Sequence, residues 1–415
     1  MSTNLKIALR FLLFKKRAML MTLSGIIFGV AFFILTQAQT SGFEQFFIRT
    51  ILGTDSALRV SDRIQMTVAE RAITASGNAP PIVVETVRKY IEGVEYPIEL
   101  KKAIRAMPET TGVAEVLRGS VKLDSNMRGN YDAQLFGINI KEFSAVSNLE
   151  GQIISGSLEE FGKSPQGILL ASRVAIRVNA RIGDVLNLTA GKTTQRFTVM
   201  GVFETGVGDI DKVRVIVHTN AARSLLNRPF GATYLQVALE DPDTAPAVAR
   251  RMQEAFRHRS VPWQESEKVW LEVFRMLRFS SAITVSTIIL VSALGMFNTL
   301  AMLVIEKTRE IAILRSFGFS KRDVTSIFLW LGWLVITLGT TLGCAVGALL
   351  TWATGSIPLR IRGIFSTDHF IVSWNLSHYA AAVCTAVVVV FIASYFPARR
   401  AALIEPGDII RGASS

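Results

Sequence analysis

The stretch from Met296 to Asp323, MFNTLAMLVIEKTREIAILRSFGFSKRD, is the most informative part of the chain. An uncharged run long enough to span a bilayer ends at Ile305, and a short amphipathic segment with five charged residues follows it without a break: Glu306, Lys307, Arg309, Glu310 and Arg315. After a Phe-Gly-Phe turn comes a second basic pair, Lys321 and Arg322. A membrane helix that continues into a charged helix at the cytoplasmic face can pass force from a soluble partner into the bilayer. The pattern therefore favours a transporter subunit driven by another protein over a self-contained enzyme.

Four long stretches without Asp, Glu, Lys or Arg determine the predicted fold class. They are Ala18–Phe43, Phe279–Ile305, Val324–Leu359 and Phe370–Ala398, and each exceeds the roughly 20 residues that a spanning helix needs. The 415-residue chain is half hydrophobic and has a formal net charge of +12. Such a basic balance can indicate nucleic-acid binding, but the hydropathy argues against that class. We expect an α-helical membrane protein with four transmembrane helices and a large α+β extracytoplasmic domain inserted between the first and second.

Short basic flanks predict the orientation. Lys and Arg gather at the N-terminus, between the second and third spans, and at the C-terminus, whereas the loop between the third and fourth spans has only Arg360 and Arg362. Because cytoplasmic loops carry the excess of Lys and Arg, both termini are predicted to be cytoplasmic. The expected organisation is a cytoplasmic N-terminal segment (1–17), a first span (18–40), the external domain (41–278), a second span (279–305), a cytoplasmic coupling helix (306–323), a third span (324–355), a short external loop (356–372), a fourth span (373–397) and a cytoplasmic tail (398–415).

The external domain is long enough for its own core, and for two lobes. Ser41–Leu52 is predicted to continue the first span as a helix with Phe43, Phe46 and Phe47 on one side, and either substrate or lipid contact or simple packing would explain them. Turn signals and β-rich runs then predict an α+β region followed by a small β-rich lobe. The predicted strands are Ala57–Val60, Gly112–Leu117, Gly167–Ala171, Val185–Thr189, Gln195–Phe203, Val213–His218 and Tyr234–Leu239, and the predicted helices are Ile98–Met107, Ser172–Val178 and Asp243–Arg257.

Residues for catalysis or metal binding are not apparent in the sequence. Both cysteines, Cys344 and Cys384, lie in predicted spans, and the four histidines have no ligand spacing. Gly162-Lys163-Ser164 resembles the end of a phosphate-binding loop, but the glycine required five residues earlier is Ser157. If the protein uses chemical energy, a separate ATPase must supply it.

Two further patterns concern contacts between helices. Gly339, Gly343 and Gly347 lie at four-residue spacing in the third span, which lets helix backbones approach closely in lipid; packing within one chain and a contact between subunits are both open. The amphipathic segment Lys307–Phe317 could lie on lipid headgroups. Its balanced charge and its place between two spans favour docking to a partner.

Several motifs together carry a family resemblance over nearly the whole chain. They are MFNTLAMLVIEKTREIAILRSFG, ASYFPARRAALIEP (Ala393–Pro406), TSGFEQFFIRTIL (Thr40–Leu52), RFTVMGVFETG (Arg196–Gly206) and STDHFIVSW (Ser366–Trp374). The chain resembles the lipoprotein-releasing ABC transporter permeases of the LolC/LolE type, within the wider group that includes MacB-like exporters and FtsX.

The resemblance implies a multi-pass protein of a bacterial inner membrane, with the external domain in the periplasm. Its expected partners are a dimer of cytosolic ABC ATPases, a second permease subunit (the same or a paralogue), a lipoprotein substrate, membrane lipids and a periplasmic carrier. ATP and Mg²⁺ would be used by the ATPase, so the chain itself is expected to bind no cofactor and to catalyse no reaction. The residues expected in the ATPase-coupling segment are Arg309, Glu310, Ile313, Leu314, Arg315, Phe317 and Gly318, and those expected near a lipid cavity are Phe43, Phe46, Phe47, Met296 and Phe297.

One departure from the family leaves alternatives open. LolC-type permeases carry a proline-containing hairpin arm that recruits the carrier, between strands equivalent to Val185–Thr189 and Arg196–Gly201. Here only Ala190–Gln195 connects the two, which is enough for a tight turn. Either the chain is the LolE-like partner of a heterodimer, or its transporter releases cargo to another acceptor. The alternative functions are MacB-like export of another amphipathic cargo and FtsX-like transmembrane signalling without transport.

Overall fold

The computed structural model describes residues 7–11, 16–63, 93–125, 129–358 and 369–403. Parts of the predicted N-terminal segment (1–17), short loop (356–372) and C-terminal tail (398–415) lie outside the described residues. The chain divides into two compact units. Of the described residues, the helical unit comprises those up to Gln45, those from Glu272 to Pro358 and those from His369 on, and the mixed unit comprises those between Phe46 and Leu271.

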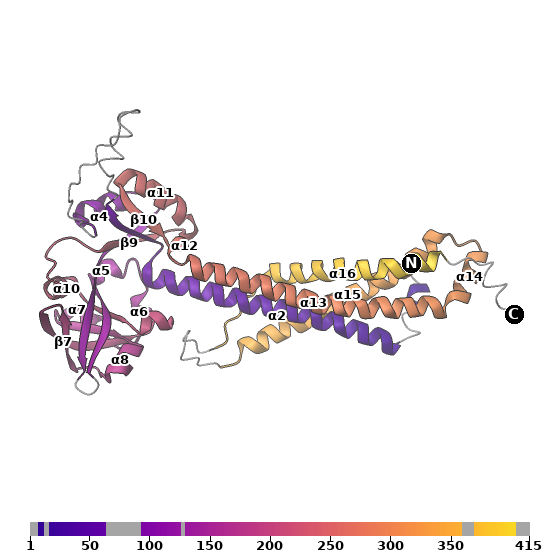
Figure 1. Ribbon diagram of the computed structural model, residues 1–415, viewed down its shortest axis with the longest axis horizontal. Helices are drawn as coiled ribbons and strands as arrows, with labels where there is room; N and C mark the ends of the chain where they lie inside the picture. Colours follow the sequence, from indigo (N-terminus) through magenta and orange to yellow (C-terminus); the bar gives the residue numbers. More distant parts are fainter. Residues whose placement is uncertain (1–6, 12–15, 64–92, 126–128, 359–368, 404–415) are drawn as a thin grey trace, which may run out of the picture. The chain divides into compact units, whose positions relative to one another are not determined.

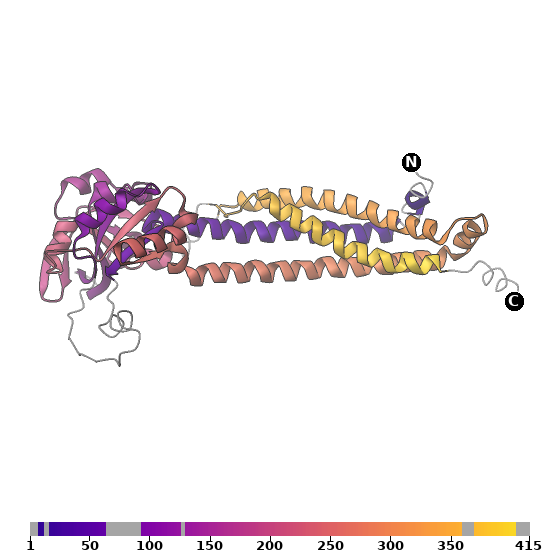
Figure 2. The same ribbon diagram turned by 90° about the horizontal axis from the view of Figure 1, so that it is seen from above.

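Four helices among the described residues are long and apolar enough to cross a membrane. They are α2 (Lys16–Asp55), α13 (Lys268–Glu306), α15 (Lys321–Gly355) and α16 (Leu376–Ala402), and they run side by side (Figures 1 and 2). The predicted continuation of the first span through Ser41–Leu52 is confirmed, because α2 is unbroken to Asp55. The second long helix begins at Lys268, before the uncharged run that the sequence marked.

The core of the helical unit draws on all four helices. Each contributes apolar side chains that are buried: Ile26, Val30 and Ile34 from α2; Ile289, Met296 and Leu300 from α13; Phe328, Leu331 and Val335 from α15; and Ala382, Ala386 and Val390 from α16. Other large apolar side chains of the same helices remain exposed, such as Phe28, Leu290 and Trp352. An apolar exterior around an apolar core is what a membrane helix requires, since lipid is its solvent.

A short helix, α14 (Thr308–Ser316), separates α13 from α15. It ends in a left-handed Gly318 (φ +93°), where the Phe319 N–H donates to the Leu314 carbonyl at 3.2 Å, the geometry of a Schellman cap. Two residues later Ser320 caps α15, and its side chain and that of Asp323 bond each other's backbone N–H groups. The Phe-Gly-Phe turn of the sequence is thus a fixed break between two helices.

Over the described residues, a sheet of ten strands organises the mixed unit, in the order β10-β1-β9-β2-β3-β8-β5-β7-β4, with β6 paired to β2 and β7. The strands are β1 (Leu58–Arg63), β2 (Thr110–Ser125), β3 (Gly129–Ile138), β4 (Ile153–Gly156), β5 (Gly167–Ala171), β6 (Val185–Ala190), β7 (Thr193–Phe203), β8 (Arg214–His218), β9 (Tyr234–Leu239) and β10 (His258–Pro262). The helices are α4 (Pro97–Arg105), α5 (Ile140–Phe143), α6 (Leu149–Gln152), α7 (Leu158–Lys163), α8 (Ser172–Val178), α9 (Gly208–Asp211), α10 (Thr219–Leu225), η1 (Pro242–Thr244), α11 (Ala245–Phe256) and α12 (Trp263–Ser266).

Part of this sheet closes on itself. β2 pairs with β3, β3 with β8, β8 with β5, β5 with β7, β7 with β6, and β6 again with β2. The larger hydrophobic core lies on these strands and includes Leu123, Leu135, Leu188 and Val199. A closed ring leaves few unpaired strand edges, which suits a domain without disulfide bonds.

The second core lies on β1, β9 and the start of β2, against α4, α11 and Trp263 of α12. Figure 1 shows α4 and α11 beside these strands. Both helices are amphipathic: α4 buries Leu100 and Ile104, and α11 buries Val248 and Met252. The strand β2 serves both cores, since Val113 belongs to this one and Val116 to the larger one.

The prediction of an α+β region followed by a β-rich lobe is therefore wrong in its order. The closed ring is inserted between the two halves of the α+β region, because β9, α11 and β10 return to pair and pack with β1, β2 and α4. Most of the individual elements are confirmed, and β5, α8 and β9 have the predicted bounds. Among the described residues, the sequence pattern did not predict β3, β4, β10 or six short helices: α5, α6, α7, α9, α10 and α12.

Candidate coupling and cargo-binding sites

The first candidate site is the surface of α14, where the coupling segment was predicted. Ile311 and Ala312 face the protein and are buried. On the other side Ile313 and Phe317, one helical turn apart, are 48% and 81% exposed. Two neighbouring apolar side chains in solvent on a short charged helix are suited to insertion into a partner's groove.

Charged residues fix the start of α14. Lys307 forms an ion pair with Glu310 and lies 5.9 Å above the ring of Phe11. Arg315 is half-buried in the last turn, where a cation is favourable near the helix C-terminus. Of the seven residues predicted for coupling, Ile313 and Phe317 thus present the exposed apolar surface, Leu314 is half-buried, and Gly318 forms the turn that ends the helix.

The glycine stripe of the third span packs against α2 of the same chain. A Cβ atom added at Gly339 would lie 2.8 Å from Ile26 Cγ2, one at Gly343 would lie 2.8 Å from Val30 Cβ, and one at Gly347 would lie 3.0 Å from Ile34 Cδ1. The three partners repeat every four residues, as the glycines do, so one ridge of α2 fits one groove of α15. Of the two readings that the sequence left open, the structure supports contact within the chain.

We expect Gly343→Val to destabilise the helical unit. The added Cβ would be 2.8 Å from Val30 Cβ and 3.2 Å from the Ile27 carbonyl oxygen, and overpacking of this kind costs about 1–3 kcal/mol. Gly295→Val on α13 is the matched control, because nothing lies within 4 Å of its added Cβ. Thermal denaturation of the purified variants in detergent would measure the difference. Equal melting temperatures for the two variants would contradict the packing role.

The five residues predicted to line a lipid cavity are not brought together within the chain. Phe43 contacts Phe370 edge-to-face at 5.5 Å between ring centroids. Its neighbour Gly42 lets the backbone of Val372 approach, since an added Cβ would lie 2.8 Å from Val372 Cα. Phe43 therefore lies where the chain before α16 crosses α2.

Met296 lies far from that crossing. Antiparallel contacts between α2 and α13 include Gly25 with Ser292, and the Gln37 side chain with the Arg278 carbonyl. About five helical turns, roughly 27 Å along α13, separate Arg278 from Met296. Met296 is fully buried, with Sδ 3.9 Å from the Ser394 hydroxyl.

Phe47 is also enclosed, in this case within the mixed unit. It is 1% exposed and lies 5.4 Å from Trp270 between ring centroids. Lipid contact by Phe47 or Met296 would require packed side chains to be uncovered. Phe43, Phe46 and Phe297 are half-buried, and lipid contact stays a prediction for them.

An ion cluster that no local sequence pattern indicates lies at the last residue of α2, Asp55. Arg214 Nη2 lies 3.0 and 3.3 Å from the two carboxylate oxygens of Asp55, and Gln236 Nε2 lies 3.5 Å from one of them. Arg59 adds a longer ion pair at 3.8 Å. The side chains of Arg214 and Asp55 are only 9% and 17% exposed, so the end of the long helix is tied to the sheet by a largely buried ion pair.

The charge of Asp55 in this cluster contributes to the pKa shifts of two nearby groups, Glu267 and Tyr234. Burial, followed by the Asp55 carboxylate, raises the pKa of Glu267 above its ordinary value. The same two causes raise the pKa of Tyr234, against the opposing charges of Arg59 and Arg214. A long sequence separation explains why the cluster was missed, since Asp55 and Arg214 have no local pattern that links them.

Two protein-family models match successive parts of the chain. Residues 19–255 match the model of the MacB-like periplasmic core domain, and residues 282–406 match the FtsX-like permease C-terminal region. The chain is 26% identical to the lipoprotein-releasing system transmembrane protein LolC of Xylella fastidiosa strain 9a5c, over 98% of both chains. It is 21% identical to the LolE protein of Haemophilus influenzae, over 93% of this chain and 92% of that protein.

The chain is less similar to the solved structures that it matches than to these LolC and LolE sequences. The periplasmic region of MacB from Actinobacillus actinomycetemcomitans matches with a TM-score of 0.35 and 14% identity, covering 54% of this chain and 95% of that one. The extracellular domain of the YknZ transporter matches with a TM-score of 0.34 and 14% identity, covering 49% of this chain and 98% of that one.

Proposed function

Since the chain belongs to the family of the MacB-like periplasmic core domain, followed by an FtsX-like permease C-terminal region, we propose that it is a permease subunit of an ABC transporter that releases lipoproteins from the outer leaflet of a bacterial inner membrane. The similarity to LolC and LolE proteins over nearly the full length supports this class of cargo. Energy would come from ATP hydrolysis in a separate cytosolic subunit. Both termini would be cytoplasmic and residues 41–278 periplasmic.

The observation that carries the proposal is the exposed apolar pair of α14. Ile313 and Phe317 project from a short helix that lies between two spanning helices. A cytosolic ATPase that held this pair could move α13 and α15 together. Only Lys307 separates α13 from α14, and the short capped turn at Gly318 and Ser320 joins α14 to α15. This is how the chain would turn a soluble partner's motion into a motion within the bilayer.

The connection between β6 and β7 bears on the acceptor of the cargo. Ala190 pairs directly with Thr193, so the loop is the two residues Gly191 and Lys192, with Gly191 at φ +59°. A LolC-type arm has no room in a two-residue turn. We propose that a paralogous second permease, or a different periplasmic acceptor, takes over that role, and identification of the subunits that co-purify with the chain would distinguish the two.

Photo-crosslinking tests the cargo. Crosslinkers at Phe43 and Phe297, which are half-buried, are expected to trap triacylated lipoproteins in the nucleotide-free complex and fewer of them after ATP is added. The physical reason is that acyl chains offer apolar area, at about 0.8 kcal/mol per buried CH₂, and few directed hydrogen bonds.

A crosslinker at Phe391 on α16, which is 43% exposed, is the matched control and should meet bulk lipid whether or not ATP is present. If Phe43 and Phe297 also trapped only bulk phospholipid, with no response to ATP, signalling without transport would be favoured. ATP-dependent trapping of a non-lipidated cargo would instead favour MacB-like export.

The proposed orientation predicts the labelling of single cysteines. Both native cysteines would first be replaced by Ala, since Cys384 is exposed and Cys344 half-buried. In intact spheroplasts a membrane-impermeant thiol reagent should label Lys192→Cys, in the β6–β7 turn, and leave Lys321→Cys unlabelled. Both positions are exposed in the structure, so lysed membranes should label both. Labelling of Lys321→Cys in sealed cells would overturn the orientation.

A further inference from the structure

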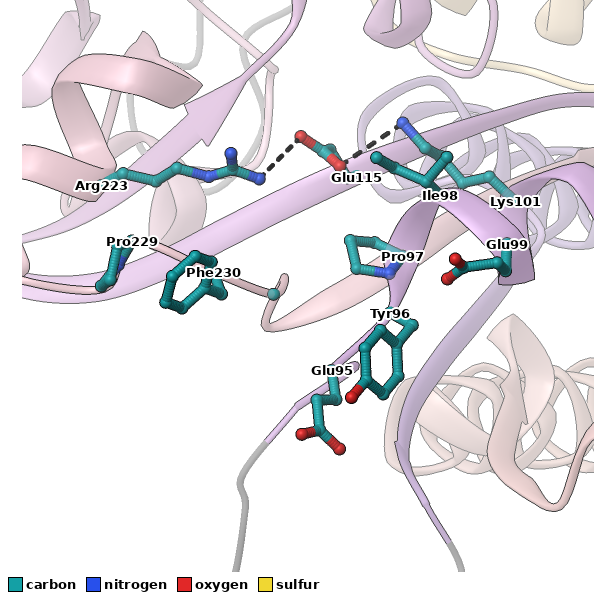
Figure 3. Close-up of a pocket in the computed structure, with 11 residues that line it drawn as sticks. Glu95, Tyr96, Pro97, Ile98, Glu99, Lys101, Glu115, Arg223, Pro229 and Phe230 are labelled. Carbon is teal, nitrogen blue, oxygen red and sulfur yellow. Dashed lines mark hydrogen bonds and ion pairs between the residues drawn. The ribbon is translucent and has the colours of Figure 1, made fainter.

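A hollow of about 520 Å³ opens on the surface of the mixed unit. We call it the Glu115 hollow. Its rim consists of the segment around the start of α4 (Glu95–Glu99) and the loop Pro229–Gly231, and its floor consists of Lys101, Glu115 and Arg223. Figure 3 shows Phe230 on the left and Tyr96 to its right, with Glu115 between Arg223 and Lys101 above them in the view.

The two rim loops are held in a fixed relation. Val94 and Ala232 exchange backbone hydrogen bonds of 2.8 and 2.9 Å. Glycines at positive φ flank this bridge, Gly93 at +103° and Gly231 at +76°. An added Cβ would lie 2.4 Å from the Ala232 oxygen at Gly93 and 2.8 Å from the Val94 oxygen at Gly231. Such a close bridge means that the hollow exists before anything binds, which lowers the entropic cost of binding.

The rim exposes an unusual amount of apolar surface. Tyr96 is 66% exposed, Ile98 is 74% exposed and Phe230 is 83% exposed. Large apolar side chains that gather around one concavity are typical of interaction sites, and aromatic residues are frequent binding anchors. The hollow is therefore suited to a macromolecular partner.

The charged residues that line the hollow indicate which charge a partner should carry. In the floor, the two oxygens of Glu115 lie 3.3 Å from Arg223 and 3.4 Å from Lys101, so these charges are already paired. On the rim, the exposed carboxylates of Glu95 and Glu99 have no ion-pair partner within the part of the chain that the structure describes. The mouth of the hollow thus has an excess of negative charge beside two aromatic rings. That combination attracts a cation, through Coulomb and cation–π interactions.

One donor atom in the floor of the hollow, Arg223 Nε, lacks a hydrogen-bond acceptor among the described residues. This atom is buried, and a buried N–H without an acceptor is costly. Glu115 already engages the Nη2 end of the same guanidinium group. A peptide carbonyl is a neutral acceptor of suitable size for the remaining N–H.

We propose that the Glu115 hollow binds an extended polypeptide segment of a partner protein that carries a Lys or Arg side chain. The basic group lies at the mouth, between the rings of Tyr96 and Phe230 and beside the carboxylates of Glu95 and Glu99. A backbone carbonyl of the same segment accepts a hydrogen bond from Arg223 Nε. The inference does not depend on the proposed transport of lipoproteins.

Carbodiimide coupling tests this on the full-length protein in detergent, because it joins a lysine amine to a carboxylate only where the two lie in contact. The probe is an acetylated and amidated decapeptide of Gly and Ser with one central Lys, and mass spectrometry locates the coupled carboxylates. We expect coupling at Glu95 or Glu99 to exceed that at Glu254, an exposed carboxylate on α11, by about fivefold or more.

The variant Phe230→Ser keeps both rim carboxylates and removes only a surface aromatic side chain, so folding should be unaffected. Its coupling yield is expected to fall about fivefold towards the Glu254 level. An excess of uncoupled peptide with Arg in place of Lys should compete, and a peptide with Glu there should not. Equal yields at Glu254, no change in Phe230→Ser, competition by the Glu peptide, or coupling of Glu95 or Glu99 to a lysine of this protein itself would each overturn the proposal.

Discussion

Replacing Ile313 or Phe317 by Asp is expected to abolish association of a cytosolic ATPase with this chain while leaving its insertion into the membrane unchanged. Both side chains are exposed on one face of α14. In the proposed complex they fill an apolar groove, where Asp would place an unpaired charge. Loss of such an anchor costs about 2 kcal/mol or more, or roughly 30-fold in Kd. Co-purification of the ATPase with tagged variants, followed by titration of the purified subunits, would measure the loss.

Ser316→Asp is the matched control for this experiment. Ser316 is exposed on the same helix, so the variant adds the same charge without removing either apolar side chain. It should retain the ATPase. Normal ATPase recovery with both Ile313→Asp and Phe317→Asp would rule out α14 as the docking element and remove the main support for an ATP-driven permease.

The second large effect is expected at the ion pair of Asp55 and Arg214. Asp55→Leu or Arg214→Met alone should destabilise the mixed unit by about 3–5 kcal/mol. The first leaves Arg214 buried without its carboxylate, and the second leaves Asp55 only the longer ion pair with Arg59. The double variant should recover a large part of this loss, since it buries neither charge. Resistance of the mixed unit to proteolysis during urea titration of the purified full-length protein would give the midpoints.

An exposed ion pair in the same unit is the control. Lys163 and Glu159 form one whose side chains are 74% and 77% exposed, and Lys163→Met should cost at most about 1 kcal/mol. If Arg214→Met were as mild as Lys163→Met, the end of α2 would not be held by this pair. A double variant that is less stable than either single one would also contradict the account.

Local pattern was sufficient for the membrane helices and for much of the mixed unit. Each spanning helix satisfies its own backbone groups and needs only a long apolar run, so the sequence of any one span predicts it. In the mixed unit, β5 and α8 follow directly from an apolar run and a helical period, and both bounds agree with the structure. The β6–β7 turn was likewise predictable, because Gly191 lies between two strand patterns.

Contacts between distant segments were not predictable in this way. The pairing of β1 with β9 and β10 joins residues that lie 175 to 204 positions apart. It places the closed ring between two halves of the α+β region, which the sequence pattern did not predict. The spacing of Gly339, Gly343 and Gly347 predicted a close helix contact and did not identify α2 as the partner. The aromatic side of α2 gave no indication that Phe47 is enclosed by Trp270.

The amino-acid sequence by itself thus determined the four spans, the short charged helix between the second and third long helices, and the family resemblance, because these depend on composition and spacing within single segments. Only the tertiary structure decided that Ile313 and Phe317 are the exposed pair of α14, that Met296 is buried, that Asp55 meets Arg214, and that two rim loops form the Glu115 hollow. The physical reason is that burial and ion pairing are properties of neighbours in space, and those neighbours are brought together by strand pairing and helix packing over long separations in the chain.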